Sequence, residues 1–166
     1  MNHTKINIGG GQHKKEGFST IDIRPYPEVD IIADLNKGIP LPDNSVEEVL
    51  ALSILEHLDD TCFAMEEIYR VCKKNALVTI TVPYVKSTAA FKDPTHKRFF
   101  CEKTFEYFDK RAKLPDYQLK CNFRVEKISY KYYTPWFRFI PGINRFFARF
   151  FWDIIKTMTM KLRVIK

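Results

Sequence analysis

Three glycines and one acidic residue make up the first group of residues that can do chemistry. Gly9, Gly10 and Gly11 follow a short apolar run, and Asp22 ends the next one. Glycines at the end of a strand let the backbone approach a ligand that a Cβ atom would exclude. An acid ending the neighbouring strand can accept hydrogen bonds from both hydroxyls of a ribose. The pattern predicts an adenosyl-binding site, and a tight turn beside a surface aspartate is the alternative.

A second acid, Asp34, follows a third apolar run and precedes Leu35. We expect the carboxylate to accept a hydrogen bond from an adenine amino group, and the leucine to pack on the ring. Asp34 is equally suited to a helix cap or a turn. The dinucleotide fingerprint needs a glycine three residues after Gly11, where this chain has Lys14. That difference disfavours a pyrophosphate-binding helix start, and with it an NAD-dependent oxidoreductase.

Two histidines follow later strands and are candidates for work on a second substrate. Ser53 and His57 come after the fourth expected strand, and Asp93 and His96 come after the fifth. We expect Ser53 to contact the cofactor through its backbone, and His96, Asp93 and His57 to be the catalytic residues. A packed His57, and an Asx-turn with a surface His96, are the structural alternatives. We expect no metal ion, because the two histidines and Asp93 lack a fourth ligand and a spacing signature.

These residues need a sheet whose strand ends hold them together. Short β-branched and apolar runs predict strands at 5–8, 19–23, 29–33, 46–53, 77–82, 123–133 and 157–165. Alternation with helical stretches indicates an α/β fold: a Rossmann-like, doubly wound, mostly parallel sheet with helices on both faces. We expect residues 1–166 to form one compact domain, in which the basic, aromatic part at 118–166 completes the sheet.

One long amphipathic helix is expected before the fifth strand. Asp59 or Asp60 can cap it, and it runs to about Lys74, after which Asn75 can take a left-handed conformation. Shorter helices are expected at 102–108 and 143–155. The apolar side of the long helix would hold Ala64, Ile68, Val71 and Cys72, and its outer side a Glu66–Arg70 pair.

The last part of the chain is basic and aromatic. Residues 118–166 hold 11 Lys and Arg against two acids, a net charge of +9, whereas residues 1–117 hold 16 against 18. The favoured interpretation of the helix at 143–155 is packing on the sheet. An anionic membrane surface is a second partner for it, and stacking on nucleic-acid bases is least favoured. Its apolar face would hold Ile143, Phe146, Phe147, Phe150, Phe151 and Ile154, opposite Arg145, Arg149 and Lys156.

Cysteine usage and hydropathy bear on the compartment. The four cysteines form no Cys-x-x-Cys pair, which argues against a zinc ribbon or a thioredoxin-like site. The sequence has neither a signal-peptide core nor an apolar run of about 18 residues. We therefore expect a cytoplasmic protein with free thiols, peripheral at a membrane if the basic helix binds one. The oligomeric state stays open.

Several short stretches, taken in order, resemble one enzyme family. Residues 6–11 (INIGGG) and 17–22 (GFSTID) are similar to the opening of class I S-adenosylmethionine-dependent methyltransferases of the type 11-like family. Residues 33–35 (ADL), 39–45 (IPLPDNS), 55–58 (LEHL), 67–71 (EIYRV) and 82–84 (VPY) match its later signatures. Residues 93–96 (DPTH) and 104–108 (TFEYF) resemble a compact branch often found among enzymes that modify surface glycans or small metabolites.

The resemblance implies S-adenosylmethionine as cofactor, held by Gly9, Gly11, Asp22, Asp34 and the backbone near Ser53. It implies methyl transfer to an oxygen or nitrogen nucleophile of a small-molecule or glycan-type acceptor. Two features depart from the family pattern: residues 12–18 are too few for the usual helix, and residues 73–76 (KKNA) replace a Lys-Pro-Gly-Gly turn. The alternative is a non-catalytic adenosyl-binding module on an anionic membrane or an enzyme complex, because the short chain leaves little room for an acceptor lid.

Overall fold

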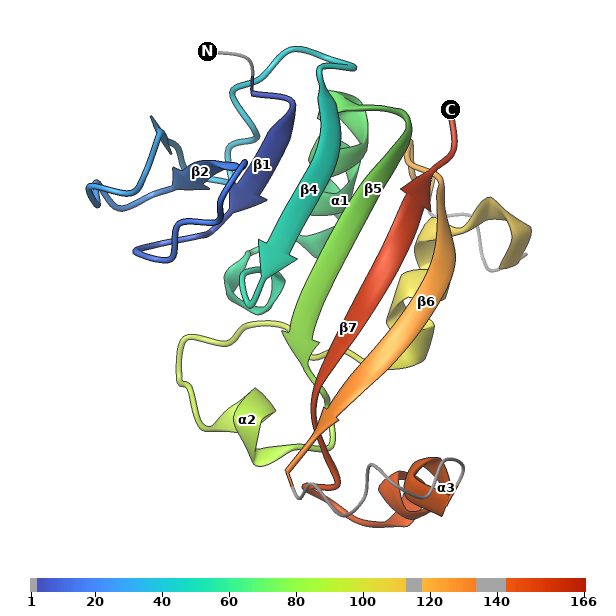
Figure 1. The fold of residues 1–166 in the computed structure, drawn as a ribbon. Coiled ribbons are helices and arrows are strands. Elements are labelled where there is room, and N and C mark those ends of the chain that lie inside the picture. The colour runs from blue at the N-terminus through green and yellow to red at the C-terminus, as the bar shows by residue number, and fades with distance from the viewer. Residues whose placement is uncertain (1–2, 113–117, 134–142) are drawn as a thin grey trace.

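The strands of the molecule form one mixed sheet. The computed structural model describes residues 3–112, 118–133 and 143–166. The strands are β1 (Lys5–Ile8), β2 (Ser19–Asp22), β3 (Ile31–Ile32), β4 (Val46–Leu52), β5 (Cys72–Pro83), β6 (Phe123–Tyr132) and β7 (Ile155–Val164). They make a seven-stranded sheet in the order β3-β2-β1-β4-β5-β7-β6 (Figure 1).

The sheet has a point at which its winding reverses. β1 to β5 pair in parallel, and β7 runs antiparallel to both β5 and β6. The chain passes from β1 outward to β2 and β3, and then returns to β4 on the other side of β1. In such sheets, ligands bind where the carboxyl ends of the strands meet this reversal. The predicted Rossmann-like, mostly parallel fold is confirmed.

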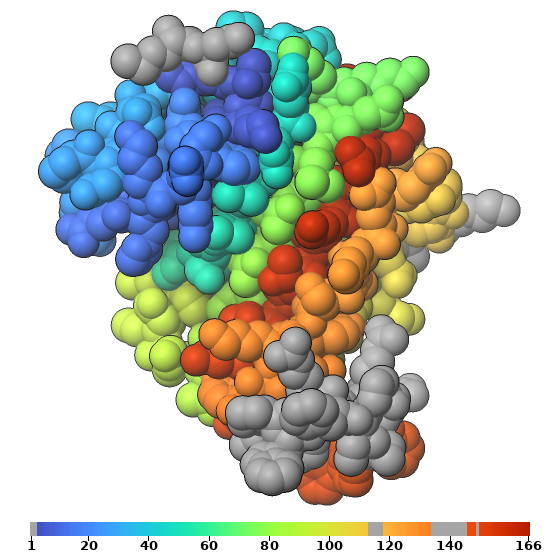
Figure 2. Space-filling model, in the orientation of Figure 1, coloured from blue at the N-terminus to red at the C-terminus, as the bar shows by residue number. Residues whose placement is uncertain are grey.

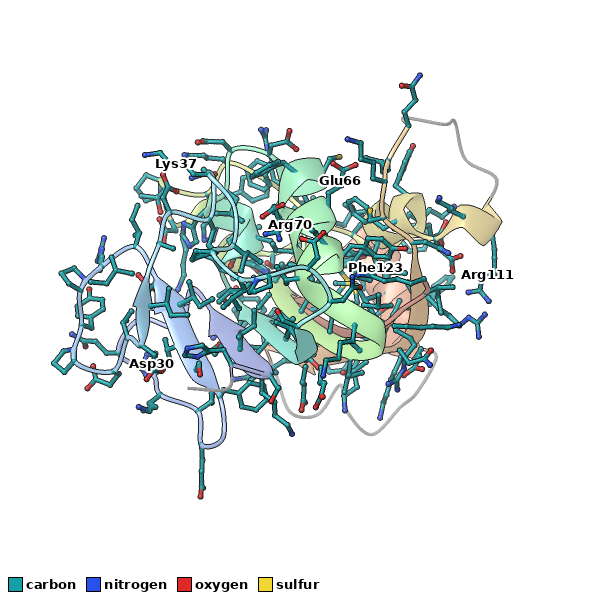
Figure 3. The ribbon with its side chains drawn as sticks, turned by 90° about the horizontal axis from the view of Figure 1, so that it is seen from above. Asp30, Lys37, Glu66, Arg70, Arg111 and Phe123 are labelled. Carbon is teal, nitrogen blue, oxygen red and sulfur yellow. The ribbon has the colours of Figure 1, made fainter. Side chains whose placement is uncertain are left out.

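Helices are predicted on both faces of the sheet, but in the described part of the chain the helical cover lies mainly on one face (Figure 2 and Figure 3). The helices are α1 (Thr61–Val71), α2 (Thr88–Phe91) and α3 (Ile143–Phe150), with 3-10 turns η1 (Leu55–His57), η2 (Glu102–Phe108) and η3 (Lys110–Ala112). Seen from above, α1 with Glu66 and Arg70 lies on one side of the sheet (Figure 3). The opposite side shows β5, β7 and β6 at the molecular surface (Figure 2). There, the Thr81 and Thr159 hydroxyls bond across the strands at 2.8 Å.

The core lies between the sheet and α1. The predicted alternation of β7 is observed, because Met158, Met160, Leu162 and Val164 are fully buried. The predicted cap of α1 is also present: the Asp60 carboxylate accepts from the backbone N–H groups of Cys62 and Phe63 at 2.8 and 3.1 Å. The apolar side of α1 then packs on the sheet through Ala64, Met65, Ile68 and Val71.

The end of α1 differs from its prediction. The helix stops at Val71 rather than near Lys74, because Cys72 already pairs with Val46 and begins β5. Asn75 has the predicted left-handed conformation, φ 64°, but within an irregularity of β5 rather than at the exit of the helix.

The ion pair predicted on α1 forms with a different partner. Arg70 binds Glu67 at 2.7 Å rather than Glu66, since it also donates to the Ile39 and Leu41 carbonyl oxygens, at 2.7 and 2.9 Å. Glu66 instead accepts from the Lys120 backbone at 2.7 Å.

The aromatic helix corrects the favoured interpretation. α3 ends at Phe150 rather than at Ile155. Packing on the sheet is wrong for its described aromatic side chains, because Phe146 and Phe150 are both 62% exposed. The side chains of Arg145 and Arg149, and all of residues 134–142, lie outside the described part. No helix within that part has the length and apolar character needed to span a bilayer.

Candidate cofactor and acceptor site

The glycine turn at the end of β1 admits no side chain. Gly9 has φ 65°, and a Cβ atom on it would lie 2.4 Å from the Ile54 Cγ1 atom. A Cβ atom on Gly10 would lie 2.4 Å from the Asn7 side-chain nitrogen. An L-residue at Gly9 would therefore meet both a steric clash and a left-handed backbone. The turn keeps the chain close to Ile54, which follows β4.

Asp22 is fixed at the end of β2 by the backbone around it. Its Oδ2 atom accepts from the N–H of Gly11 at 2.8 Å, and its Oδ1 atom accepts from the N–H of Arg24 at 3.0 Å. A carboxylate oxygen has two lone pairs, so each oxygen keeps acceptor capacity for a ligand hydroxyl. The glycine turn thus orients the acid as well as making room beside it.

Asp34 lies next to Asp22 through the β2–β3 connection. The N–H of Ala33 donates to the Asp22 carbonyl at 2.9 Å. The Asp34 Oδ1 atom accepts from the N–H of Asn36 at 3.0 Å, in an Asx-turn. The Lys37 Nζ atom lies 3.8 Å from the Asp34 Oδ2 atom. The Asx-turn and a hydrogen bond to adenine are therefore compatible, because the local hydrogen bonds leave acceptor capacity on the Asp34 carboxylate.

One cavity collects residues from these strand ends. Its volume is about 160 Å³. Acids from two neighbouring strand ends, a glycine backbone and an apolar floor suit a ribose and an adenine ring. Its lining consists of Gly9, Asp22, Ile23, Ala33, Asp34, Leu35, Asn36, Ile54, His57 and Leu58.

Ser53 turns the chain from β4 into η1. It has φ 55°, which is uncommon for a residue with a side chain, and its N–H donates to Thr81 on β5 at 2.8 Å. Backbone strain of this kind persists where the surrounding structure enforces it. The turn places Glu56 and His57 at the carboxyl end of β4.

The loop around Asp93 is tied to the same turn. The Asp93 Oδ1 atom accepts from the Thr95 N–H at 2.9 Å and from its hydroxyl at 2.7 Å, so the Asx-turn reading is present. The Glu56 carbonyl accepts from the N–H of Lys97 at 2.7 Å. This bond brings the loop against η1, and the ring centroids of His57 and His96 are 4.8 Å apart.

A buried carboxylate lies beside the two histidines. Glu56 is 1% exposed, and burial raises its pKa to about 7. Burial, and then the neighbouring His96, lower the pKa of His57. Hydrogen bonds from Thr95 lower the pKa of Asp93. The region around η1 therefore combines a carboxyl that resists ionisation, a histidine that resists protonation and a surface carboxylate that ionises readily.

Comparisons with known proteins agree with this arrangement. Residues 14–80 match the family model of the methyltransferase domain. This match covers less than half of the chain, and over that segment the chain is similar to S-adenosylmethionine-dependent methyltransferases. A comparison with curated protein sequences gives no match.

Solved structures share the fold of this chain at low sequence identity. A methyltransferase from Archaeoglobus fulgidus superposes with a TM-score of 0.66 and 18% identity, covering 95% of this chain and 84% of its own. The methyltransferase in complex with the Haloferax volcanii Trm112 activator gives 0.63 and 13%, covering 99% and 84%. The [4+2]-cyclase SpnF gives 0.61 and 14%, covering 96% and 74%. Because a cyclase shares this fold, the fold alone does not fix the reaction.

The structure places the predicted site residues in three groups. Gly9, Asp22, Asp34, Leu35 and His57 line the cavity together. Gly10, Gly11 and Ser53 shape or hold its walls through the backbone. His96 and Asp93 belong to the neighbouring loop: the His96 ring contacts the His57 ring, and Asp93 bonds to Thr95, which bonds to His57.

The prediction misses five residues that line the cavity, Ile23 and Ile54 among them, and one nearby acid, Glu56. Ile23 follows Asp22 directly and is 60% exposed, so its side chain is available to a ring in the cavity. Ile54 packs against the glycine turn. An apolar residue directly after a strand-end acid is a usable sequence signal for the first. Glu56 carries no such signal, because its burial depends on the loop that covers it.

Proposed function

We propose that this chain transfers the methyl group of S-adenosylmethionine to an oxygen or nitrogen atom of a small-molecule or glycan-type acceptor. The cavity carries this proposal, because Gly9, Asp22 and Asp34 come from three strand ends and line one cavity. Their chemistry suits an adenosyl group. The methyltransferase family match over residues 14–80 supports the same reaction class. The adenosyl group would occupy the Asp22–Asp34 end, and the sulfonium would point toward His57.

The reaction needs positioning more than covalent help from the protein. The acceptor lone pair attacks the methyl carbon in line with the sulfur, an O–C or N–C bond forms, and the S–C bond breaks. S-adenosylhomocysteine leaves with the electron pair of that bond, and the acceptor proton passes to a base or to water. The positive sulfur already activates the methyl group. Holding the two reactants in line supplies most of the rate enhancement.

The acceptor is proposed to lie beside the two histidines. His57 lines the cavity and contacts His96, so both rings border the place where a methyl group would leave the cofactor. Asp93 holds Thr95, and Thr95 holds His57, at 2.7 and 3.0 Å. These residues would orient the acceptor hydroxyl or amine. Asp93 would act through Thr95 and His57 rather than by direct contact with the methyl group.

An anionic membrane is a second proposed partner, favoured by an exposed aromatic patch. Phe91 stacks on Phe99 with ring centroids 4.5 Å apart, and Trp152 lies 5.5 Å from Phe91. With Phe150 and Phe151, each of these side chains is at least 45% exposed. Three of these aromatics, Phe150, Phe151 and Trp152, lie in the 118–166 segment of net charge +9, and exposed aromatic anchors on a basic segment are typical of peripheral membrane binding. Phe91 belongs to α2, which follows β5 and lies beyond its carboxyl end (Figure 1).

Ligand binding tests the reaction class without a known acceptor. Calorimetry should show that S-adenosylhomocysteine binds and that NAD does not. A thermal shift with the same two ligands should agree, because a ligand that binds only the folded state stabilises it. Binding of NAD with no binding of S-adenosylhomocysteine would contradict the proposal. Once an acceptor candidate is found, methylated product separates an enzyme from a non-catalytic adenosyl-binding module.

A further inference from the structure

The group formed by Glu56, His57 and His96 has the geometry of a metal site. One ligand atom from each side chain lies within 4.8 Å of the other two. Zinc binds imidazole nitrogen at about 2.0–2.1 Å and carboxylate oxygen at about 2.0–2.2 Å. Tetrahedral ligands at those distances lie roughly 3.3 Å apart. Side-chain rotations would have to bring the three atoms to that separation when an ion binds.

His96 presents an unprotonated nitrogen to this group. Its Nδ1 atom lies 2.8 Å from the Ala90 carbonyl oxygen, which can only accept a hydrogen bond. Nδ1 therefore carries the proton, and Nε2 keeps its lone pair in the neutral ring. Histidines that bind metals commonly donate their second ring N–H to a backbone carbonyl in this way. The side chain is 8% exposed, so its orientation is fixed by packing as well.

His57 is held in the same tautomer by a longer chain of hydrogen bonds. The Thr95 hydroxyl donates its proton to the Asp93 carboxylate at 2.7 Å. The same hydroxyl lies 3.0 Å from the His57 Nδ1 atom. Because a hydroxyl has one proton to give, it must accept from Nδ1, and this leaves the lone pair on Nε2. In both rings, Nδ1 thus makes the supporting hydrogen bond and Nε2 keeps its lone pair.

Glu56 supplies the negative charge. Neither of its carboxylate oxygens makes a hydrogen bond of normal geometry within the described residues, although the Ser53 hydroxyl contributes a weaker interaction. A buried carboxylate without partners is strongly unfavourable unless a proton or a cation neutralises it. A divalent ion between the carboxylate and the two imidazoles would satisfy all three side chains at once.

Surrounding charges suit a cation. The Asp93 Oδ2 atom lies 3.8 Å from the His96 Nε2 atom, which adds a second negative group near the same place. The nearby ammonium group of Lys97 is paired with Asp59 at 2.6 Å. The Arg98 side chain donates to the Asp59 carbonyl. Both cationic side chains, Lys97 and Arg98, are thus bound to Asp59.

We propose that Glu56, His57 and His96 bind one divalent transition-metal ion such as Zn²⁺ at the carboxyl end of β4. Two imidazoles and one carboxylate are ligands that zinc and related ions prefer, and three protein ligands leave a position open. The binding site stands on its own contacts. Its use in catalysis rests on the proposed function: beside the cavity, the ion would polarise an acceptor hydroxyl and favour its deprotonation.

Calorimetric titration of chelator-treated protein with ZnCl₂ tests the site. The wild type should bind one ion, and Glu56→Gln and His96→Ala should each weaken binding by about tenfold or more. Glu56→Gln keeps the shape of the side chain and removes a buried charge, so the variant should stay folded without metal. His13→Ala is the matched control, because His13 lies outside the group, and it should bind zinc like the wild type. Equal zinc affinity in all four proteins would overturn the proposal.

X-ray absorption at the zinc edge identifies the ligands directly. Nitrogen and oxygen neighbours support the site, whereas sulfur neighbours would assign the ion to cysteines such as the exposed Cys62 and refute it. S-adenosylhomocysteine binding by the metal-free protein separates the two proposals. If that ligand binds and zinc does not, the metal site fails and the reaction class stands. If zinc binds and S-adenosylhomocysteine does not, the metal site stands and the proposed reaction class fails.

Discussion

The proposed adenosyl end of the cavity and the proposed acceptor end beside His57 differ in how their acidic groups are hydrogen-bonded. At the adenosyl end, Asp22 accepts from two backbone N–H groups and Asp34 from one. At the acceptor end, Glu56 is buried and neither carboxylate oxygen makes a normal hydrogen bond within the described residues. The first end is prepared by its own backbone to receive a neutral, hydroxylated ligand. The second keeps a group whose burial is unfavourable until a proton or a cation arrives.

The two ends also differ in the range of the contacts that build them. Gly11 and Asp22 are close in the sequence, and the β1–β2 connection alone brings them together. The Glu56 carbonyl is held by the N–H of Lys97, about forty residues later, through a loop that follows β5. A change at the adenosyl end should therefore act locally, whereas the acceptor end depends on loop closure over a longer separation.

The largest expected effect is at the glycine turn. Gly9→Ala should lower the free energy of unfolding by about 3 kcal/mol, because it combines left-handed strain with a contact 2.4 Å from Ile54. Gly17→Ala is the control: Gly17 has φ 77° and no neighbour within 4 Å of the added Cβ. It should lose about 1 kcal/mol, the backbone strain alone. Urea unfolding measures both. Equal losses would show that the Ile54 contact has no energetic weight.

The next effect is on cofactor affinity. Asp22→Ala should weaken S-adenosylhomocysteine binding about 10- to 100-fold, because a charge-assisted contact contributes roughly 1.5–3 kcal/mol. Asp43→Ala, at an exposed carboxylate, should bind as the wild type does. Glu56→Gln should also leave the affinity nearly unchanged, since it lies at the other end. Calorimetry on folded variants decides this, and unchanged affinity for Asp22→Ala would remove the ribose assignment.

These two predictions rest on the part of the site that the sequence reveals well. Glycines and acids at strand ends are visible because strands, turns and strand-end residues are local features of the chain. The number of strands, their approximate places in the chain and the burial of alternate β7 residues follow from the same patterns. That is why Gly9, Asp22 and Asp34 meet as expected.

Residues whose surroundings depend on tertiary contacts are predicted less well from the sequence. Glu56 reads as a surface residue of a polar turn until the Asp93–Arg98 loop covers it. Periodicity makes α3 an amphipathic helix but does not say which surface its apolar side meets, and Phe146 and Phe150 face solvent. Arg70 chooses Glu67 over Glu66 because the carbonyl groups of the 39–41 loop lie on that side.

A smaller effect is expected at the exposed aromatic patch. The protein should associate weakly with anionic vesicles at low salt, with about 1 kcal/mol from each basic residue near the surface, and release at high salt. Phe150→Ser with Trp152→Ser should reduce the association without unfolding, because both side chains are more than half exposed. Ile32→Ser, at an equally exposed site on β3, is the control. An absence of co-sedimentation at low salt would refute membrane contact.

The smallest expected effect concerns the ion pair that braces the adenosyl end. Glu67 accepts from the Ile39 N–H at 2.9 Å, while Arg70 holds the Ile39 and Leu41 carbonyl oxygens. The hydrogen bond from Arg70 lowers the pKa of Glu67 below its usual 4.5. Its stabilising contribution is therefore complete above the unfolded pKa and is lost as the pH falls through the lower, folded pKa.

The matched variant isolates that contribution. At neutral pH, the wild type should be more stable than Glu67→Gln by less than about 1 kcal/mol, because the pair is partly exposed to solvent. The difference should shrink toward about pH 3, where the carboxyl becomes neutral like the amide. Glu47→Gln is the control, since Lys73 lowers the pKa of Glu47 on the open surface. Urea unfolding at both pH values measures the two variants. A difference for Glu67→Gln that stays constant with pH would mean that the charge of Glu67 does not brace the loop beneath the adenosyl end.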